Sequence, residues 1–293
     1  MARIAVIGPG AVGGTVAAWL AQDPDHELQL CVRTPFEALI VDTPHGRIGA
    51  RPAIVTDPAD AAPADWVLVA TKTYDAAGAA RWFPGLLGPQ TQVGILQNGV
   101  EHVERFLPWL ERDRIVPAVV DIPAEREAPG RIAQRMPGTI VVPAGDAGGR
   151  FADLFEKTRL AVSTTDDFET ALWRKLAINS AGGVNAVVMR PSEVASDEAI
   201  AGLMRDLVAE CVAVGRAEGA TLDDDLGDQV IGHYRSMPGD SVNSIYADRL
   251  AGRPTEVDAR NRVVARIGLR HDIAAPLNDL MATLIDAASH SDR

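Results

Sequence analysis

The chain has 293 residues, 47% of them hydrophobic and 23% charged, which predicts a folded protein with room for two domains. Its formal net charge of −12 argues against sequence-independent binding to nucleic acid and against binding to an anionic membrane surface. No apolar run reaches the length that spans a bilayer, so we expect no membrane association.

The cysteines and the first residues indicate in which cellular compartment the protein is expected. Cys31 and Cys211 are far apart in the sequence, and each falls in an apolar segment, as free buried thiols do in a reducing compartment. Met1 to Arg3 lead directly into an apolar run, so we expect no signal peptide before the fold. We therefore expect a cytoplasmic protein.

Residues 4–21 predict a dinucleotide-binding turn. An apolar, β-branched run over 4–7 meets a G-x-G-x-x-G pattern, and an alanine-rich helix is expected over 11–21. Strand, turn and helix in this order are the context in which the three-glycine pattern is informative. A glycine-rich turn without a ligand is the competing interpretation.

The three glycines of the pattern have separate expected roles. Gly8 allows the tight turn, Gly10 lets the backbone approach a pyrophosphate, and Gly13 lets the helix pack closely on the strand. The phosphates would lie at the helix N-terminus, near Ala11 and Val12, where N–H groups have no helical partner and the dipole favours negative charge.

The end of the next expected strand, residues 27–32, distinguishes between cofactors. About twenty residues beyond the glycines, an Asp or Glu would accept hydrogen bonds from the ribose 2′-hydroxyl of NAD. This strand ends at Arg33 instead, which suits the 2′-phosphate of NADP. We predict NADP(H) as the cofactor, with a solvated loop arginine as the alternative.

Two polar residues follow expected buried strands. Lys72 comes just after the strand over 65–70, and Asn98 just after the strand over 92–96. Ligands of parallel sheets bind beyond the carboxyl ends of the strands, so both residues are expected to meet cofactor or substrate. Asn98 followed by Gly99 fits a simple turn equally well.

The rest of the first half predicts strands without long helices. We expect strands over 115–120, 131–134 and 139–142, forming an antiparallel edge on the parallel sheet. A helix over 150–157 with a solvated Lys157, and a strand over 160–164, would close the domain.

Strand signals stop at Asp167, and about five helical segments follow. The predicted fold class is therefore α/β, with a Rossmann-type dinucleotide-binding domain over residues 1–166 and an all-α domain over 167–293. Few linker residues separate the two, so we expect a cleft between tightly joined domains. The oligomeric state stays open, with a homodimer through the helical domain as one candidate.

The first helix of the second half carries Lys175 and Asn179, which are four residues apart and share a helix face. Lysine is rare in this chain, and a compact ammonium that can release a proton is a role that arginine does not fill. Gly182 and Gly183 follow, each costing about 1 kcal/mol relative to alanine inside a helix. Close approach by a backbone or a flat ring, and a break in the helix, both explain them.

A later segment predicts another helix start. Pro254 precedes Thr255, a candidate N-cap, and Asp258 follows three residues later, as in a capping box. Glu256 and Asp258 in a first helical turn also suit the helix dipole. This explains both acids structurally, so spacing alone gives Glu256 no catalytic role.

Taken together, these segments resemble the ketopantoate reductase family over essentially the full length of the chain. The motifs that carry the resemblance are Gly8-Pro-Gly-Ala-Val-Gly-Gly14, Lys72, Gln97-Asn98-Gly99, Trp173-Arg-Lys-Leu-Ala-Ile-Asn179, and Ser244 with Gly252-Arg-Pro-Thr-Glu-Val-Asp258.

The resemblance implies roles for individual residues. Lys175 would be the general acid, and Glu256 would help to place that lysine and the substrate. Contacts to the substrate or the nicotinamide would come from Asn98, Asn179 and Ser244. Lys72 would face the cofactor and Arg33 would hold the NADPH 2′-phosphate.

The implied activity is NADPH-dependent reduction of a 2-oxo acid, with 2-dehydropantoate (ketopantoate) giving D-pantoate in pantothenate and coenzyme A biosynthesis as the first candidate. Hydride delivery leaves an alkoxide at C2, so an acid must be aimed at that oxygen. No metal is expected. A reductase of another branched 2-oxo acid and a non-catalytic NADP-binding sensor are the alternatives.

Two positions depart from the family pattern. A second asparagine is typical four residues after the one matching Asn179, where this chain has Gly183, and Asn185 comes two residues late. An asparagine is also frequent where this chain has Ser241. Both positions are expected to line the substrate site, so they leave the choice of 2-oxo acid open.

Overall fold

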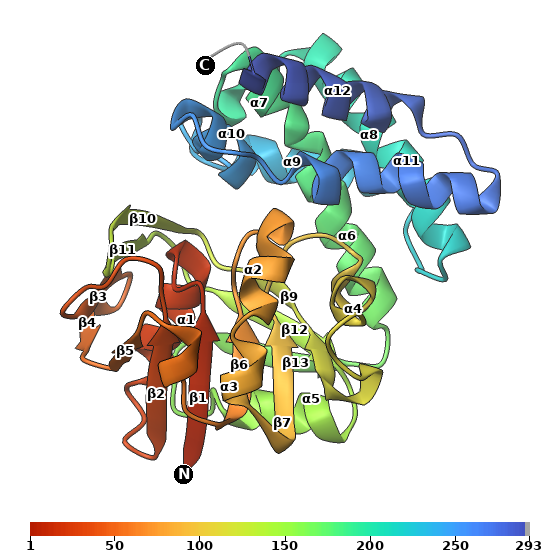
Figure 1. Ribbon diagram of the computed structural model, residues 1–293. Coiled ribbons are helices and arrows are strands. Elements are labelled where there is room, and N and C mark those ends of the chain that lie inside the picture. The colour runs from red at the N-terminus through yellow and green to blue at the C-terminus, as the bar shows by residue number, and fades with distance from the viewer. Residues whose placement is uncertain (291–293) are drawn as a thin grey trace. The chain divides into compact units, whose positions relative to one another are not determined.

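The computed structural model describes residues 1–290, which form two compact units (Figure 1). The first unit consists of Met1–Gln97 and Glu101–Phe168. The second consists of the chain from Glu169 onward, together with the short segment Asn98–Val100. Asn98, with Gly99 and Val100, thus belongs to the helical unit, while Gln97 and Glu101 on either side belong to the first unit.

A six-stranded parallel sheet lies at the centre of the first unit. Its order is β5 (Ala53–Val55), β2 (His26–Cys31), β1 (Ala2–Ile7), β6 (Ala64–Val69), β7 (Leu87–Ile95) and β8 (Ile115–Pro117). The direction of strand succession reverses between β1 and β6. Open α/β sheets bind ligands at such a point, beyond the carboxyl ends of the strands.

Both faces of this sheet are buried, as continuous apolar runs predict. Ile4 and Val6 of β1 face one core, whereas Ala5 and Ile7 face another. The first core includes helices α1 (Ala11–Leu20) and α5 (Asp146–Asp153), and the second includes α2 (Ala76–Ala80), α3 (Phe83–Leu86) and α4 (His102–Phe106).

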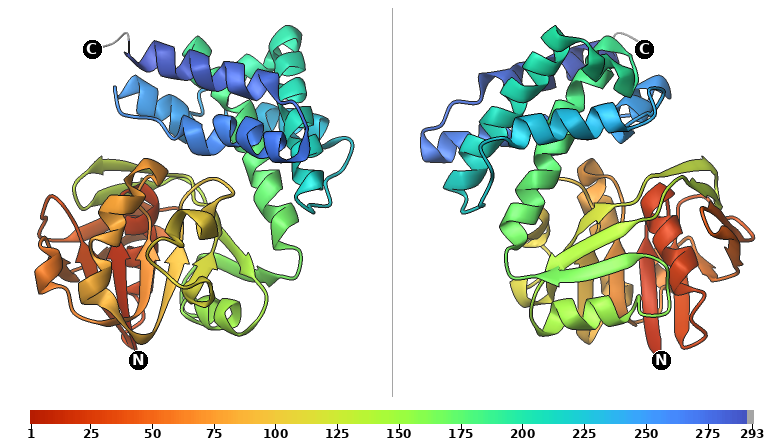
Figure 2. Two further views of the ribbon diagram at one scale, coloured as in Figure 1. Left: turned by 45° about the vertical axis from the view of Figure 1, so that its right-hand side comes forward. Right: turned by 180° about the vertical axis from the view of Figure 1, so that it is seen from behind.

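The predicted antiparallel edge is wrong, because the strands after β8 leave the parallel sheet. One set forms a sheet in the order β10 (Ala124–Ala128), β11 (Arg131–Gln134), β3 (Leu39–Thr43), β4 (Gly46–Ala50), and another forms the order β13 (Ala161–Thr165), β12 (Thr139–Pro143), β9 (Val119–Asp121). Ile132 and Ile140 join the core of α1 and α5, so these strands bury apolar side chains there instead of extending the sheet. Figure 2 shows β12 and β13, in green, beside α5 in the view from behind.

Two local predictions near the end of the first unit also fail. Helix α5 begins four residues earlier than the predicted helix, and it includes Gly148, where a Cβ would be 1.8 Å from the Pro143 carbonyl oxygen. Lys157 is not simply solvated, because its ammonium donates to Asp23 (2.9 Å) and Asp25 (2.8 Å). These bonds lower the pKa of both carboxyls, with the Asp25 backbone N–H the largest cause at Asp23.

The second unit is built from helices, and its described residues contain no strand. They are α6 (Phe168–Ala181), α7 (Gly183–Val188), α8 (Glu198–Ala217), α9 (Leu226–Ser236), α10 (Ser244–Leu250), α11 (Val263–Gly268) and α12 (Pro276–His290), with a π-helical turn over Asp258–Arg262. Met204, Leu207 and Cys211 of α8 are fully buried at the centre of one hydrophobic core. The α/β class with a helical second half is confirmed.

Cys31 and Cys211 are both free and buried, as predicted, and burial raises the pKa of each thiol to about 12. Among residues 1–290, no helix combines the length and the apolar character needed to cross a membrane.

Candidate active site

The glycine turn after β1 has the geometry that its pattern predicts. Gly8 has a φ of +78°, and a Cβ there would lie 2.8 Å from the Thr71 side chain. A Cβ at Gly13 would lie 2.7 Å from Ala70 Cβ, so a side chain would push α1 off the sheet. At Gly10, in contrast, the nearest atom to a Cβ is 4.0 Å away. The backbone at Gly10 is therefore open to a close ligand.

The N-terminus of α1 fits an anionic ligand. The first helical hydrogen bond runs from Gly14 N–H to the Gly10 carbonyl, so the N–H groups of Ala11, Val12 and Gly13 have no acceptor within the helix. No side chain caps this end, and its first turn contains no acidic residue. These residues fit a pyrophosphate group, which would accept from the N–H groups and meet the positive end of the dipole.

Arg33 lies beyond the end of β2, with 89% of its side chain exposed. Its guanidinium is 3.5 Å from the carboxylate of Asp75, which lies in a short 3₁₀ turn after β6. An exposed ion pair of this length is weak, so Arg33 can exchange this partner for a phosphate. Sequence reasoning missed Asp75, because no local pattern relates it to Arg33.

Gln97, which follows β7, holds the loop after β6 in place. Its buried side-chain amide donates to Thr71 Oγ1 (3.0 Å) and to the Lys72 carbonyl (3.2 Å), and its oxygen accepts from Arg105 (3.2 Å). The backbone of half-buried Lys72 is thereby fixed beside the end of the sheet. The sequence motif at this position includes Gln97 but indicates no role for it.

His102 fixes the backbone just before Asn98. Its Nε2 is 2.7 Å from the Gln97 carbonyl oxygen, and a carbonyl only accepts, so the ring proton is on Nε2. Burial, with a smaller effect of Arg105, lowers the pKa of His102 to about 4. The ring is therefore neutral at pH 7, and its buried Nδ1 has no partner in the described residues.

In the second unit, three of the predicted site residues meet. Asn98 donates a 3.1 Å hydrogen bond to the carboxylate of Glu256, and Asn179 Nδ2 is 3.5 Å from the Asn98 side-chain oxygen. Glu256 and Asn179 are buried, with 5% and 9% of their surfaces exposed. Gly99, with a φ of +94°, provides the turn that directs Asn98 here.

Ser244 and Asn179 are joined through a buried arginine that sequence reasoning did not identify. Arg260, only 2% exposed, donates to Ser244 Oγ and to the Asn179 carbonyl, both at 2.8 Å. Burial lowers the pKa of Arg260, while Tyr234, Glu256 and Asp248 oppose that shift. An arginine keeps its charge even so.

Lys175 lies one turn before Asn179 on α6 and is half-buried. Side chains four residues apart on a helix are neighbours, so Lys175 and Asn179 share the face predicted from the sequence.

The two glycines that follow mark a break between α6 and α7. A Cβ at Gly182 would lie 2.4 Å from Tyr234 Oη and 2.8 Å from Asn243 Nδ2, while one at Gly183 would lie 3.0 Å from Asn261 Oδ1. Both interpretations from the sequence thus hold in part. The helix breaks, and the groups that approach it are polar side chains instead of a backbone or a flat ring.

Side chains donate to four carbonyl groups at this break, one of which, at Ile178, also accepts from the Gly182 N–H. They are held by Tyr234 (Ile178 carbonyl), Arg260 (Asn179 carbonyl), Asn261 (Ser180 carbonyl) and Asn243 (Gly182 carbonyl). The end of α6 is therefore stabilised by a polar cluster formed over long sequence distances.

Asn185, the asparagine that comes late in the family pattern, and Ser241, one of the two departing positions, both make structural contacts. Asn185 is 1% exposed, donates to the carbonyls of Arg190 and Pro191, and accepts from Asn243. The Ser241 carbonyl accepts from the N–H and the hydroxyl of Ser192.

The predicted capping box at Thr255 is wrong. Helical geometry begins at Val257, and the Asp258 carboxylate accepts from Arg266 at 3.2 and 3.3 Å instead of closing a cap. Glu256 still lies at the start of this helix, where the dipole favours its charge, and its carboxylate accepts from Asn98.

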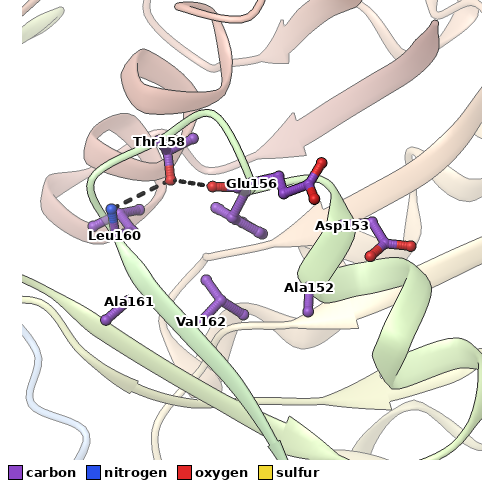
Figure 3. Close-up of a pocket in the computed structure, with 8 residues that line it drawn as sticks. Ala152, Asp153, Glu156, Thr158, Leu160, Ala161 and Val162 are labelled. Atoms are coloured by element: carbon purple, nitrogen blue, oxygen red, sulfur yellow. Dashed lines mark hydrogen bonds between the residues drawn. The ribbon is translucent and has the colours of Figure 1, made fainter.

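A surface hollow of about 380 Å³ lies elsewhere, lined by α5, β13 and the residues between them (Figure 3). Its charged side chains, Asp153 and Glu156, are both acidic, so it suits neither a dinucleotide nor a 2-oxo acid. Within residues 1–290, no three His, Cys, Asp or Glu side chains are grouped to hold a metal ion.

Comparison with protein families gives two matches that together span nearly the whole chain. The model described as Ketopantoate reductase PanE/ApbA matches residues 4–147, and the model of its C-terminal part matches residues 167–289. The 2-dehydropantoate 2-reductase of Caulobacter vibrioides is 58% identical over 289 residues, which cover 99% of this chain and 100% of that relative.

Solved structures agree with this result. A PanE/ApbA family ketopantoate reductase from Ralstonia eutropha has a TM-score of 0.90 at 30% identity, covering 99% of both chains. A D-mandelate dehydrogenase solved with NADH and anilino(oxo)acetate has a TM-score of 0.87 at 22% identity, covering 99% of this chain and 98% of its own, and shows the likeness of fold alone. The resemblance predicted from the motifs is confirmed.

Proposed function

The chain belongs to the ketopantoate reductase family, and we propose that it reduces the 2-oxo group of 2-dehydropantoate to give D-pantoate, with NADPH as hydride donor. The observation that carries this proposal is that Asn98 and Glu256 meet Asn179, which lies on the same helix as Lys175. A polar cluster of this composition matches what a 2-oxo acid and its developing alkoxide require.

Lys175 is the proposed general acid. A bound nicotinamide supplies the hydride to C2, and the negative charge then develops on the former carbonyl oxygen. The Lys175 ammonium stabilises that charge and gives a proton to the oxygen, which an arginine could not do. The Glu256 carboxylate, which accepts from Asn98, is proposed to help place Lys175 and the substrate.

Three side chains are proposed to bind the acid. Asn98 and Asn179 offer amide groups, and Ser244 offers a hydroxyl that accepts from Arg260. We propose that residues 167–293, with Asn98, supply the substrate site, and that residues 1–166 bind the cofactor.

The cofactor residues support a nicotinamide dinucleotide, with NADPH as the specific proposal. Gly8, Gly10 and Gly13 leave room for the pyrophosphate beside the N–H groups of Ala11 and Val12. Lys72 is proposed to face the cofactor, since Gln97 fixes its backbone at the sheet edge. Arg33 would bind the 2′-phosphate in place of its weak partner Asp75.

We also propose a cytoplasmic location, where thiols such as the buried Cys31 and Cys211 stay reduced. The proposed assembly is a homodimer through the helical domain, because Leu280 and Leu284 of α12 are exposed one turn apart. Analytical ultracentrifugation of wild type and a Leu280→Glu variant tests this assembly.

The test of the activity is NADPH oxidation by the wild-type chain with 2-dehydropantoate and a panel of branched 2-oxo acids. The proposal expects the highest kcat/KM for 2-dehydropantoate. A higher kcat/KM for another acid would support the alternative reductase. Tight NADPH binding without turnover of any acid would support the sensor.

A further inference from the structure

Arg260 is a buried cation whose two hydrogen-bond acceptors are both neutral. It extends from the π-helical turn before α11 to the Ser244 hydroxyl and the Asn179 carbonyl, both at 2.8 Å. Its Nε, also buried, has no hydrogen-bond partner among the described residues. A buried charge is costly unless its surroundings compensate it, so this placement calls for a reason.

One reason is structural. The bond to the Asn179 carbonyl closes part of the broken end of α6, and a cation also suits the negative end of a helix dipole. This role needs only one of the two terminal nitrogens of Arg260. It leaves the bond to Ser244 unexplained.

The bond to Ser244 determines the direction in which that hydroxyl acts. An arginine donates and never accepts, so the Ser244 oxygen is the acceptor and its own hydrogen points elsewhere. Ser244 is exposed, and no described residue accepts this hydrogen. The hydroxyl is therefore presented as a donor, with a fixed positive charge behind it.

A donor of this kind fits the anionic end of a 2-oxo acid. Glu256 lies one turn before Arg260 and Asp248 is also near, but Glu256 accepts from Asn98 and Asp248 from Arg253. Both carboxylates would repel a substrate anion, and these hydrogen bonds to other side chains fix their positions. An exposed hydroxyl backed by a guanidinium is thus the attractive element of this part of the cluster.

We propose that Arg260 is a positioning residue for the substrate, which turns the Ser244 hydroxyl toward the carboxylate of the 2-oxo acid. This inference rests on the proposed function. It assigns a role in substrate recognition to a residue four positions after Glu256, where the sequence pattern shows only an arginine in a helix.

The test is a double-mutant cycle between Arg260→Gln and Ser244→Ala, assayed with 2-dehydropantoate and NADPH. Each single variant is expected to raise the KM for the 2-oxo acid roughly tenfold, the scale of one charge-assisted hydrogen bond. Because both substitutions act through one hydrogen bond, the KM of the double variant is expected to be less than about threefold higher than that of either single variant. The KM for NADPH stays within about twofold, and Arg260→Lys, which keeps a charged donor, recovers part of the loss.

Tyr234→Phe is the matched control for the structural role of Arg260. It removes another bond to the end of α6, at the Ile178 carbonyl, without contacting Ser244. This variant is expected to lower the Tm, as Arg260→Gln does, while leaving the KM for the 2-oxo acid within about twofold of wild type.

The outcomes separate this inference from the proposed function. If the two substitutions raise the KM for the 2-oxo acid independently, so that their effects multiply in the double variant, the role of Arg260 is overturned. The proposed function still stands in that case, provided that the wild-type chain turns over 2-dehydropantoate. The role of Arg260 is overturned in the same way if Tyr234→Phe raises the KM for the acid as much as Arg260→Gln. A wild-type chain that turns over no 2-oxo acid would overturn both.

Discussion

The Asn98 side-chain amide donates a 3.1 Å hydrogen bond to the carboxylate of Glu256, which lies 158 residues later in the chain. Each residue alone has an ordinary explanation, as a turn asparagine and as an acid near a helix start. The bond between them adds a contact that neither explanation predicts. It places a buried carboxylate in the cluster that also includes Asn179.

Replacement of Glu256 by glutamine tests whether that carboxylate serves the reaction. The variant keeps an acceptor for Asn98 but loses the negative charge that is proposed to help place Lys175, so kcat is expected to fall about 100-fold. Asp258→Asn is the control, because it removes a carboxylate two residues away that binds Arg266. Equal losses of kcat in the two variants would contradict the role of Glu256.

Cofactor choice is tested at Arg33 and Asp75. Arg33→Ala is expected to raise the Kd for NADPH about tenfold and to leave the Kd for NADH unchanged, because only NADPH offers a 2′-phosphate. Asp75→Asn removes the competing carboxylate, 3.5 Å from Arg33, and is expected to lower the Kd for NADPH.

The control for the cofactor test is Arg47→Ala, since Arg47 is an exposed arginine that pairs with Asp42 on another sheet. Fluorescence titration measures both cofactors. Equal affinity of wild type for NADPH and NADH would rule out the assignment of Arg33.

Substitutions in the glycine turn are expected to affect NADPH binding and the free energy of unfolding separately. Gly10→Ala meets no atom nearer than 4.0 Å, so its free energy of unfolding is expected to stay within about 1 kcal/mol of wild type while NADPH binding is lost. Gly8→Ala is strained by its φ of +78° and by Thr71, and is expected to lose at least about 1–2 kcal/mol. Urea unfolding and NADPH titration measure the two effects. Full NADPH affinity in Gly10→Ala would contradict the predicted pyrophosphate contact.

His102 predicts a pH dependence of stability. Its pKa in the folded protein is about 4, below the ordinary histidine value, so only the unfolded chain takes up this proton as the pH falls from 6.5. Between pH 7 and pH 5 wild type is therefore expected to lose about 2 kcal/mol more than His102→Gln, which keeps a donor that does not titrate. His233→Gln, at an exposed position, is the control and should follow wild type. Equal losses in wild type and His102→Gln would contradict this prediction.

Local patterns in the sequence predict the parts of the site that local geometry determines. The roles of Gly8, Gly10 and Gly13 follow from one turn, and the shared face of Lys175 and Asn179 follows from helical periodicity. The α/β class followed by helices is predicted for the same reason, since apolar periodicity is a local signal.

The sequence cannot predict contacts that depend on the packing of distant segments. No local sequence pattern indicates three of the contacts: the ion pair of Arg33 with Asp75, the hydrogen bond of Gln97 to Thr71, and the hydrogen bond of Arg260 to Ser244. The capping box failed because Arg266, eight residues later, binds Asp258. The antiparallel edge failed because side chains such as Ile132 pack against another core, which only the folded chain defines.

The central claim is that Lys175 gives the proton to the alkoxide of a reduced 2-oxo acid. It is tested most directly by kcat of Lys175→Ala and Lys175→Arg with 2-dehydropantoate, alongside NADPH binding to each variant. Both variants are expected to bind NADPH as wild type does and to lose at least about 100-fold in kcat, because arginine keeps the charge without releasing a proton. A Lys175→Arg variant with wild-type kcat would contradict the claim.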